Sequence, residues 1–189
     1  MVGTAVAYNI PPKEFVLNIE FTRLIEATSD IAEAFDKWEN DPDLIPFIRP
    51  NPNKEALLNR ETVTVESLKK RLQHHHIYLI QLDKTLVGEM DFQIDPPHLY
   101  KKETSTAWIG INIGEATGRG RGIGLRAFQY LEEQVKQAGL KRMELGVFEF
   151  NEPAIRLYQK AGFKEIGRID RFTFWQDKMW QDIRMEKSI

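Results

Sequence analysis

The chain has no cysteine among its 189 residues, so it contains no disulfide framework, no thiol nucleophile and no thiolate ligand for a metal. It also lacks an excess of positive charge. The formal net charge is −2, from 26 Lys and Arg against 28 Asp and Glu, and the basic residues are scattered along the chain. We therefore expect no nucleic-acid partner.

Long apolar runs are absent as well. No stretch approaches the roughly 20 apolar residues of a membrane span, and the first residues, Met1 to Ala7, lack the basic start of a signal peptide. We expect no membrane insertion and a cytoplasmic location. Hydrophobic residues make up 42% of the chain, which is enough for one buried core. This predicts one domain over residues 1–189, with an N-terminal arm over residues 1–18.

Glycine is concentrated in one loop, Gly118-Arg119-Gly120-Arg121-Gly122-Ile123-Gly124. The loop leads directly into a helical stripe of apolar residues formed by Leu125, Phe128, Leu131 and Val135. Glycines allow several backbone N–H groups to turn toward one point, and the start of a helix adds unpaired donors with a partial positive charge. The pattern predicts a cradle for a phosphate-like anion.

The spacing of these glycines excludes two common nucleotide motifs. A dinucleotide fingerprint starting at Gly118 or Gly120 would need a glycine where this chain has Ile123 or Leu125. A Walker loop needs Lys-Ser or Lys-Thr after its glycines, and neither pair follows here.

Hydrophobic periodicity predicts alternating strands and helices. We expect strands over residues 21–27, 77–82, 86–94, 106–113, 143–147, 163–174 and 179–185. We expect helices from a cap at Ser29 to Asp41-Pro42, and over residues 65–74, 123–138 and 153–161. This order predicts an α/β chain with a mixed sheet, in which the helix after the glycine loop connects two parallel strands.

Two segments carry a resemblance to a known family. Arg119-x-x-Gly122-x-Gly124 resembles the acyl-CoA pyrophosphate motif of the GCN5-related N-acetyltransferases (GNAT), and residues 151–163 are similar to that family's second signature. The match covers residues 104–187 in detail and the first half only in layout. It implies the GNAT-like acyl-CoA N-acyltransferase fold: a central, mostly antiparallel sheet flanked by helices, with parallel fourth and fifth strands that splay apart and a bulge in the fourth strand.

The cofactor implied by the resemblance is acetyl-CoA. The fourth strand would pair its backbone with the pantetheine amides at Ile111, Asn112 and Ile113. Backbone N–H groups, with the arginine side chains nearby, would hold the pyrophosphate along Arg119, Gly120, Arg121, Gly122, Ile123, Gly124 and Leu125. The second signature would add Asn151, Ala154 and Tyr158, and Asn151 is also expected to cap the helix that follows it.

The implied reaction is direct transfer of the acetyl group to a primary amine in a ternary complex, through a tetrahedral intermediate. A backbone N–H around Ile111 could stabilise the oxyanion. Tyr158 matches the family tyrosine that acts as acid toward the departing thiolate, a role that suits a neutral hydroxyl. The alternative is that Tyr158 only packs beside Ile155 on the same helix.

The general base is less well marked. Many family members place a Glu on the fourth strand where this chain has Trp108. Glu89 is our first substitute, because it lies with Asp91 on the polar face of the preceding strand. His98 or Glu115 could act through water, and water-mediated removal of the proton needs no single base.

The acceptor stays open between a small amine, an antibiotic amine and a protein N-terminal amine. The proline-rich segment 43–53 is either a packed connector or a wall of the acceptor pocket, and Trp108 could stack over the acceptor. A group of C-terminal aromatic residues could line the acceptor site, form a homodimer contact or pack as a hairpin: Phe172, Phe174, Trp175 and Trp180.

Two further interpretations complete the sequence analysis. His74, His75 and His76 are expected to end a helix, because adjacent helical residues point in different directions, so we predict no metal site. A function from a different class is a non-catalytic acyl-CoA-binding sensor, which would keep the cradle and lack turnover.

Overall fold

A computed structural model of the chain describes residues 17–189. Its centre is one sheet of seven strands in the order β1-β2-β3-β4-β5-β7-β6. The strands are β1 (Ile19–Arg23), β2 (His76–Leu82), β3 (Thr85–Ile94), β4 (Thr106–Asn112), β5 (Arg142–Phe148), β6 (Lys164–Trp175) and β7 (Lys178–Ser188). Neighbouring strands are antiparallel except β4 and β5, which are parallel. The predicted mixed, mostly antiparallel sheet is confirmed.

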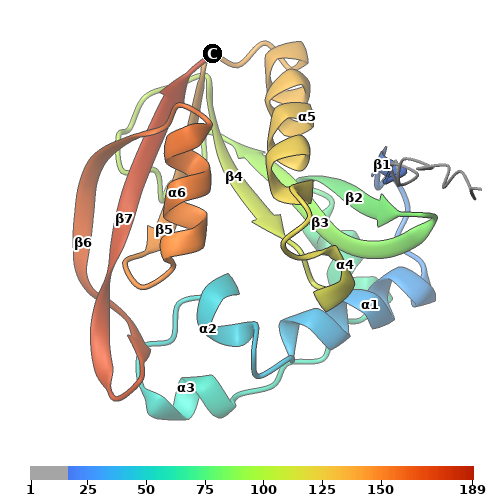
Figure 1. The fold of residues 1–189 in the computed structure, drawn as a ribbon, viewed down its shortest axis with the longest axis horizontal. Coiled ribbons are helices and arrows are strands. Elements are labelled where there is room, and N and C mark those ends of the chain that lie inside the picture. The colour runs from blue at the N-terminus through green and yellow to red at the C-terminus, as the bar shows by residue number, and fades with distance from the viewer. Residues whose placement is uncertain (1–16) are drawn as a thin grey trace, which may run out of the picture.

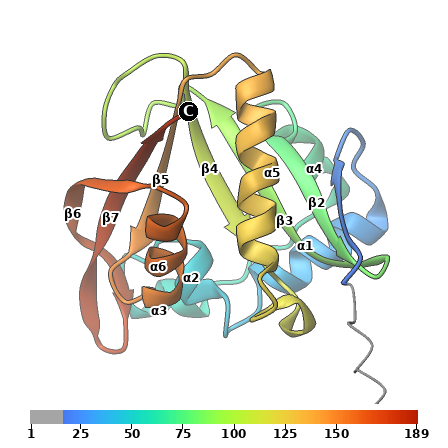
Figure 2. The ribbon, with the colours of Figure 1, turned by 45° about the horizontal axis from the view of Figure 1, so that its top comes forward.

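Helices cover both faces of this sheet (Figures 1 and 2). They are α1 (Ser29–Glu39), α2 (Ile45–Ile48), α3 (Lys54–Leu58), α4 (Val65–Arg71), α5 (Ile123–Gln137) and α6 (Glu152–Lys160), with a 3-10 helix at Ala116–Gly118. Helices α5 and α6 lie on one face, while α1 and α4 lie on the other, over β2 and β3. No helix within residues 17–189 is long and apolar enough to cross a membrane.

The main core lies between α5 and the sheet. The predicted stripe of α5 is buried, with Phe128 and Leu131 at its centre, and Met90 and Phe92 of β3 pack in the same cluster. A second cluster under α1 and α4 contains Phe35, Trp38, Leu68 and Ile77. Each fully buried large side chain contributes about 1.5–3 kcal/mol relative to exposure.

The structure differs from the predicted elements at the ends of two helices, in the bounds of β1 and in two short helices. Thr28, not Ser29, caps α1, because its Oγ1 accepts from the Ile31 N–H (3.5 Å). Helix α4 ends at Arg71 rather than His74, and β1 lies over Ile19–Arg23 rather than residues 21–27. Helices α2 and α3 were not predicted, since four or five residues are too few to show a helical period. Residues 1–16 of the predicted arm lie outside the described residues.

The parallel strands β4 and β5 separate soon after they meet. Their pairing covers three residues and ends at Trp108↔Glu144, although the strands continue to Asn112 and Phe148. Figure 2 shows β4 and β5 diverging from their paired end. The predicted splay is confirmed.

The expected bulge lies just beyond the last paired residue of β4. The register Glu89↔Asn112, if continued, would place Gly114 opposite Val87. Instead the Glu115 N–H donates to the Val87 carbonyl (2.9 Å), so one extra residue is present at this point. A glycine is needed there, because a Cβ on Gly114 would lie 2.2 Å from Cδ2 of Trp38.

This contact predicts the effect of Gly114→Ala. The added methyl group would overlap the buried Trp38 ring, and overpacking of this kind costs about 1–3 kcal/mol. Urea denaturation should show the free energy of unfolding falling by that amount. The smaller ring of Trp38→Phe should relieve part of the overlap, so the double variant should lose less than the two single losses added together. Strict additivity would contradict this packing.

Candidate active site

The glycine loop adopts backbone conformations that suit glycine. Gly120 and Gly122 have φ angles of 72° and 74°, and Gly122 caps the N-terminus of α5. A Cβ at either position would meet nothing within 4 Å. The loop is therefore open on its outer side, and these two glycines are required by conformation rather than by crowding.

Free backbone donors gather at the start of α5. None of the N–H groups from Gly120 to Leu125 donates a hydrogen bond to another group within residues 17–189. The N–H of Arg119, by contrast, donates to the Ala116 carbonyl (3.1 Å). The cradle therefore begins at Gly120, and the expected N–H donor at Arg119 is wrong because the 3-10 turn uses it. Such a cluster of donors at a helix start suits an anion.

The Arg119 side chain is also turned away from the expected task. Its Nε donates to the Ile113 carbonyl (3.0 Å) and its Nη2 to the Gly114 carbonyl (2.7 Å). Neither carbonyl takes part in a strand ladder, and the guanidinium group satisfies both. Arg119 thus connects the bulge to the glycine loop. Arg121 is exposed and makes no side-chain hydrogen bond or ion pair within residues 17–189, which leaves it available to an anion.

The second signature lies next to the glycine loop. Asn151 caps α6 as predicted, since its side chain accepts from the Ala154 N–H (3.4 Å). A Cβ on Gly124 would lie 3.2 Å from Cδ2 of Leu157, so α6 packs closely against the start of α5. A groove of about 690 Å³ runs between the two helices, lined among others by Leu125, Phe128, Gln129, Lys160 and Lys187. The groove thus extends from the first turn of α5 to the last turn of α6.

Tyr158 packs on the core, as one of the two alternatives for this residue expects. Its ring packs against the main core, with its centroid 5.9 Å from that of Phe163. Burial raises the pKa of the Tyr158 hydroxyl to about 12. The hydroxyl is therefore neutral at physiological pH, and it makes no side-chain hydrogen bond within residues 17–189, so its proton is free for a ligand.

The β4–β5 pairing ends at Trp108↔Glu144, and the opening is the gap between the two strands beyond this pair. The hydrogen-bonding pattern between β3 and β4 determines which peptide groups of β4 face it. The Asp95 N–H donates to the Thr106 carbonyl (2.9 Å), so even-numbered residues of β4 pair with β3 and odd-numbered residues point toward β5. Ile111 lies beyond the last β4–β5 pair, and its N–H and carbonyl face the opening.

The other two predicted backbone contacts on this strand are corrected. Asn112 pairs with Glu89 in β3, so its backbone does not face the opening. The carbonyl of Ile113 accepts from Arg119 (3.0 Å), so of its two backbone groups only the N–H stays free for a ligand within residues 17–189. Neither effect has a local signal, because both depend on where the bulge falls.

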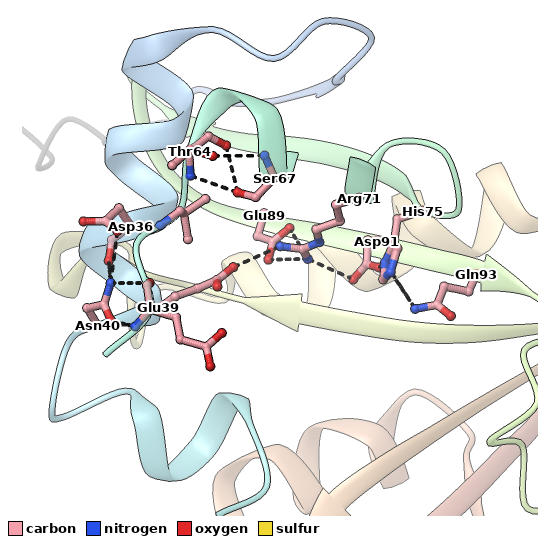
Figure 3. A network of polar contacts seen from close by, with 12 residues as sticks. Asp36, Glu39, Asn40, Thr64, Ser67, Arg71, His75, Glu89, Asp91 and Gln93 are labelled. Carbon is pink, nitrogen blue, oxygen red and sulfur yellow. Dashed lines mark hydrogen bonds and ion pairs between the residues drawn. The ribbon is translucent and has the colours of Figure 1, made fainter. Parts of the chain in front are cut away.

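Glu89 lies in a buried polar network under α1 and α4 (Figure 3). Arg71 Nη2 donates to both of its carboxylate oxygens (2.9 and 3.0 Å), and Arg71 Nη1 donates to Glu39 (3.2 Å). His75 Nδ1 contacts Asp91 in the same network. Burial raises the pKa of Glu89 to about 7, opposed by Arg71 and assisted by Asp91.

The remaining base candidates are less suited to accept a proton. Glu115 accepts from Lys37 Nζ (2.6 Å) and Trp38 Nε1 (2.8 Å), and these hydrogen bonds lower its pKa. The His98 ring packs edge-on against Trp108 at 4.7 Å, and burial lowers its pKa. Trp108 itself packs against the Arg184 guanidinium group, 4.8 Å from the ring centroid, so part of its surface is already covered.

The proline-rich segment and the C-terminal aromatics form a packed structure. Asn51 is buried, and its N–H donates to Thr173 Oγ1 of β6 (3.0 Å), as a packed connector would. The Phe47 ring packs on Phe150 at 5.5 Å and is 43% exposed, so part of this segment also borders solvent. Trp175 and Trp180 pack around Phe150 as well, at 6.4 and 5.4 Å.

The three adjacent histidines leave the helix and diverge. His75 contacts Asp91 and Gln93, while His76 begins β2 and stacks on Phe92 at 4.4 Å. Among residues 17–189, no group of three or more His, Cys, Asp or Glu side chains could hold a metal ion.

Asp182 and Arg184 were not singled out from the sequence. They alternate with Ile183 and Met185 in β7, and such alternation is typical of a strand with one solvent-exposed face. Both are nevertheless buried, with Arg184 Nη1 donating to the His98 carbonyl (3.3 Å). Their burial could not be predicted from neighbouring residues, because the loop that contacts Arg184 is remote in sequence. The one local signal is a pair of opposite charges in an apolar strand.

The role of Arg119 can be tested without a ligand. Arg119→Ala removes two hydrogen bonds from a charged donor, so amide hydrogen exchange over residues 113–118 should accelerate by about 5- to 30-fold. Arg121→Ala is the matched control, because that side chain has no partner within the described part of the chain. Equal exchange in the two variants would show that Arg119 does not hold the bulge.

Comparison with known proteins identifies clear sequence relatives. The model of the acetyltransferase (GNAT) family matches residues 31–163. The uncharacterized N-acetyltransferase YycN of Bacillus subtilis is 28% identical over 117 residues, covering 60% of this chain and 72% of the relative. The uncharacterized N-acetyltransferase YdgE of the same organism is 44% identical over 92 residues, covering 48% of this chain and 55% of the relative.

Solved structures share the fold at low identity. A ribosomal-protein-alanine N-acetyltransferase from Brucella melitensis superposes with a TM-score of 0.69 at 17% identity, covering 92% of this chain and 100% of the other. A spermidine N-acetyltransferase from Vibrio cholerae, solved with CoA and spermine, gives 0.69 at 14% identity, covering 90% and 95%. The acetyltransferase yncA from Salmonella typhimurium, solved with acetyl-CoA, gives 0.67 at 14% identity, covering 90% and 93%.

Proposed function

The chain belongs to the acetyltransferase (GNAT) family, and on that premise we propose that it transfers an acetyl group from acetyl-CoA directly to a primary amine within a ternary complex. It is an acetyl-CoA-dependent N-acetyltransferase. One observation carries the proposal most directly: the free N–H groups from Gly120 to Leu125 lie at the start of α5, next to the separated edge of β4. The homodimer and the cytoplasmic location stay predictions.

The residues of the site fit coenzyme A. The free N–H groups and the exposed Arg121 side chain suit the diphosphate, and the groove of about 690 Å³ between α5 and α6 offers room beside it. The peptide group of Ile111 can pair with an amide of the pantetheine arm. Asn151 and Ala154 contribute by fixing the start of α6 at the edge of the site. When bound, acetyl-CoA supplies a thioester carbonyl that an amine can attack.

We propose that two groups of the chain stabilise charge during transfer. A peptide N–H at the open edge of β4, at Ile111, can donate to the oxygen that becomes negative. Burial raises the pKa of the Tyr158 hydroxyl to about 12, which is well above the pKa of about 8.5 of an ordinary thiol. Complete proton transfer from Tyr158 to sulfur would therefore run uphill. Its contribution is a hydrogen bond that stabilises the leaving thiolate.

Glu89 is the residue that we propose accepts the proton of the amine. A carboxylate with a pKa of about 7 is ionised in part at neutral pH and can still take up a proton. Arg71 holds it in one orientation through two hydrogen bonds. Glu89 lies opposite Asn112, one strand away from the opening, so the proton would pass through an intervening water.

The acceptor that we propose is a small-molecule amine or a protein N-terminal amine. Relatives in both groups share the fold, since one solved structure is a spermidine N-acetyltransferase and another a ribosomal-protein-alanine N-acetyltransferase. Their low identity supports the fold alone, so the acceptor has to be found by assay.

The test is thiol release from acetyl-CoA with a panel of amines: spermidine, an aminoglycoside, L-alanine amide and a peptide that begins with alanine. Tyr158→Phe should lower kcat by about 100-fold and leave the Kd of acetyl-CoA within about twofold. Tyr100→Phe, at a 44% exposed tyrosine outside the site, should retain wild-type kcat. Binding without turnover on any amine would favour a sensor, and absence of acetyl-CoA binding would refute the cofactor.

A pH profile tests Glu89. The base must be ionised, and burial raises its pKa, so kcat/KM should be low below pH 7 and rise with a midpoint near 7. Glu89→Gln should remove this rise and lower the plateau by about 100-fold. Glu39→Gln, which removes another carboxylate from Arg71, should keep the rise. A midpoint near 7 that persists in Glu89→Gln would assign the titration to another group.

A further inference from the structure

Two glycines, Gly110 and Gly146, form the floor of the opening between β4 and β5. The register of the two strands, continued past its last pair at Trp108↔Glu144, places Gly110 level with Gly146. Both glycines are covered by a carboxylate from the next strand outward. A Cβ on Gly110 would lie 2.8 Å from Asp91 Oδ1, and a Cβ on Gly146 would lie 2.6 Å from Asp182 Oδ2. Only glycine at these positions leaves room for the carboxylates.

The two carboxylates differ in how well they are satisfied. Asp91 contacts His75 Nδ1, and Arg71 lies 3.8 Å away. Asp182 has one charged neighbour, Arg184, whose Nε lies 2.6 Å from Oδ2. The Nε–H is not well directed at the carboxylate, so the close approach of Arg184 leaves Asp182 with further acceptor capacity. Asp182 is 2% exposed and lacks well-directed donors.

Arg184 is held in place by its surroundings. Its guanidinium group lies 4.8 Å from the centroid of Trp108 and 5.6 Å from that of Phe172, and its Nη1 donates to the His98 carbonyl (3.3 Å). The cation therefore stays at the paired end of the strands and cannot turn to satisfy Asp182 fully. Buried carboxylates normally accept several hydrogen bonds, so Asp182 has acceptor capacity left for a ligand.

The charge state of Asp182 agrees with this role. Burial raises its pKa to about 6, opposed by Arg184, so the group is ionised at neutral pH. A buried carboxylate with free acceptor capacity attracts a cation that can donate N–H groups.

We propose that Asp182 binds the nitrogen of the acceptor amine over the floor formed by Gly110 and Gly146. This inference rests on the proposed acetyl transfer and names the substrate class of that site. An acceptor with a carboxylate next to its amine would bring that carboxylate close to Asp182, and the two negative charges would repel each other. The site therefore selects amines without a neighbouring carboxylate, such as a peptide N-terminus or a polyamine, over free amino acids.

The experiment compares L-alanine amide with L-alanine as acceptors. The wild type should prefer the amide by at least about tenfold in kcat/KM. Asp182→Asn should raise KM for the amide by about 10- to 100-fold, change kcat by less than about threefold, leave the Kd of acetyl-CoA unchanged and reduce the preference. Asp83→Asn, the same exchange at an exposed position of the β2–β3 turn, should change none of these values.

A second measurement covers the case in which Asp182→Asn does not fold. In the wild type, the ¹³Cγ resonance of Asp182 should shift when L-alanine amide is added, and Gly146→Ala, which displaces the carboxylate, should abolish the shift. A folded Asp182→Asn variant with unchanged KM, or an Asp182 resonance that does not respond, would overturn the proposal. If the resonance responds but no amine is acetylated, the amine site stands and the proposed transfer fails.

Discussion

The early end of the pairing between β4 and β5 is the constraint on which the rest of the structure depends. Parallel neighbours inside a sheet normally pair along their length, and a strand in the middle of a sheet has no free edge. Here the pairs stop at Trp108↔Glu144, which leaves the peptide group of Ile111 facing an opening. The start of α5 and the flank of α6 lie on one side of this opening, and the glycine floor lies on the other.

Different side-chain contacts stabilise β4 where it pairs with β5 and where the two strands are apart. At the paired end, Arg142 donates to Thr106 Oγ1 (3.0 Å), to Glu144 (2.8 Å) and to the Lys101 carbonyl (3.0 Å), so a buried ionic cluster connects β4, β5 and the loop before β4. At the open end, the bulge is held by Arg119 and by the Trp38 ring. Buried ion pairs add little net stability against apolar packing, but breaking one is costly, so the cluster favours one register.

Carboxylates on both sides of the opening are taken out of water by remote parts of the chain. Helices α1 and α4 cover Glu89, and the loop containing His98 lies over β7 beside Asp182. Desolvation raises the pKa of the first to about 7 and of the second to about 6. The burial that raises both pKa values therefore comes from packing, and neither value could be estimated from the neighbours of each residue in sequence.

Local pattern alone determined most of the elements, the glycine cradle, the cap at Asn151 and the place of Tyr158, because periods of two and 3.6 residues, glycine conformations and caps act over a few residues. Tertiary structure decided what depends on distant segments: that Arg119 binds the bulge, that Asn112 faces β3, that Glu89 pairs with Arg71, and that Asp182 is buried. Register, burial and ion pairing join residues far apart in the chain, and their energies appear only when the sheet has formed.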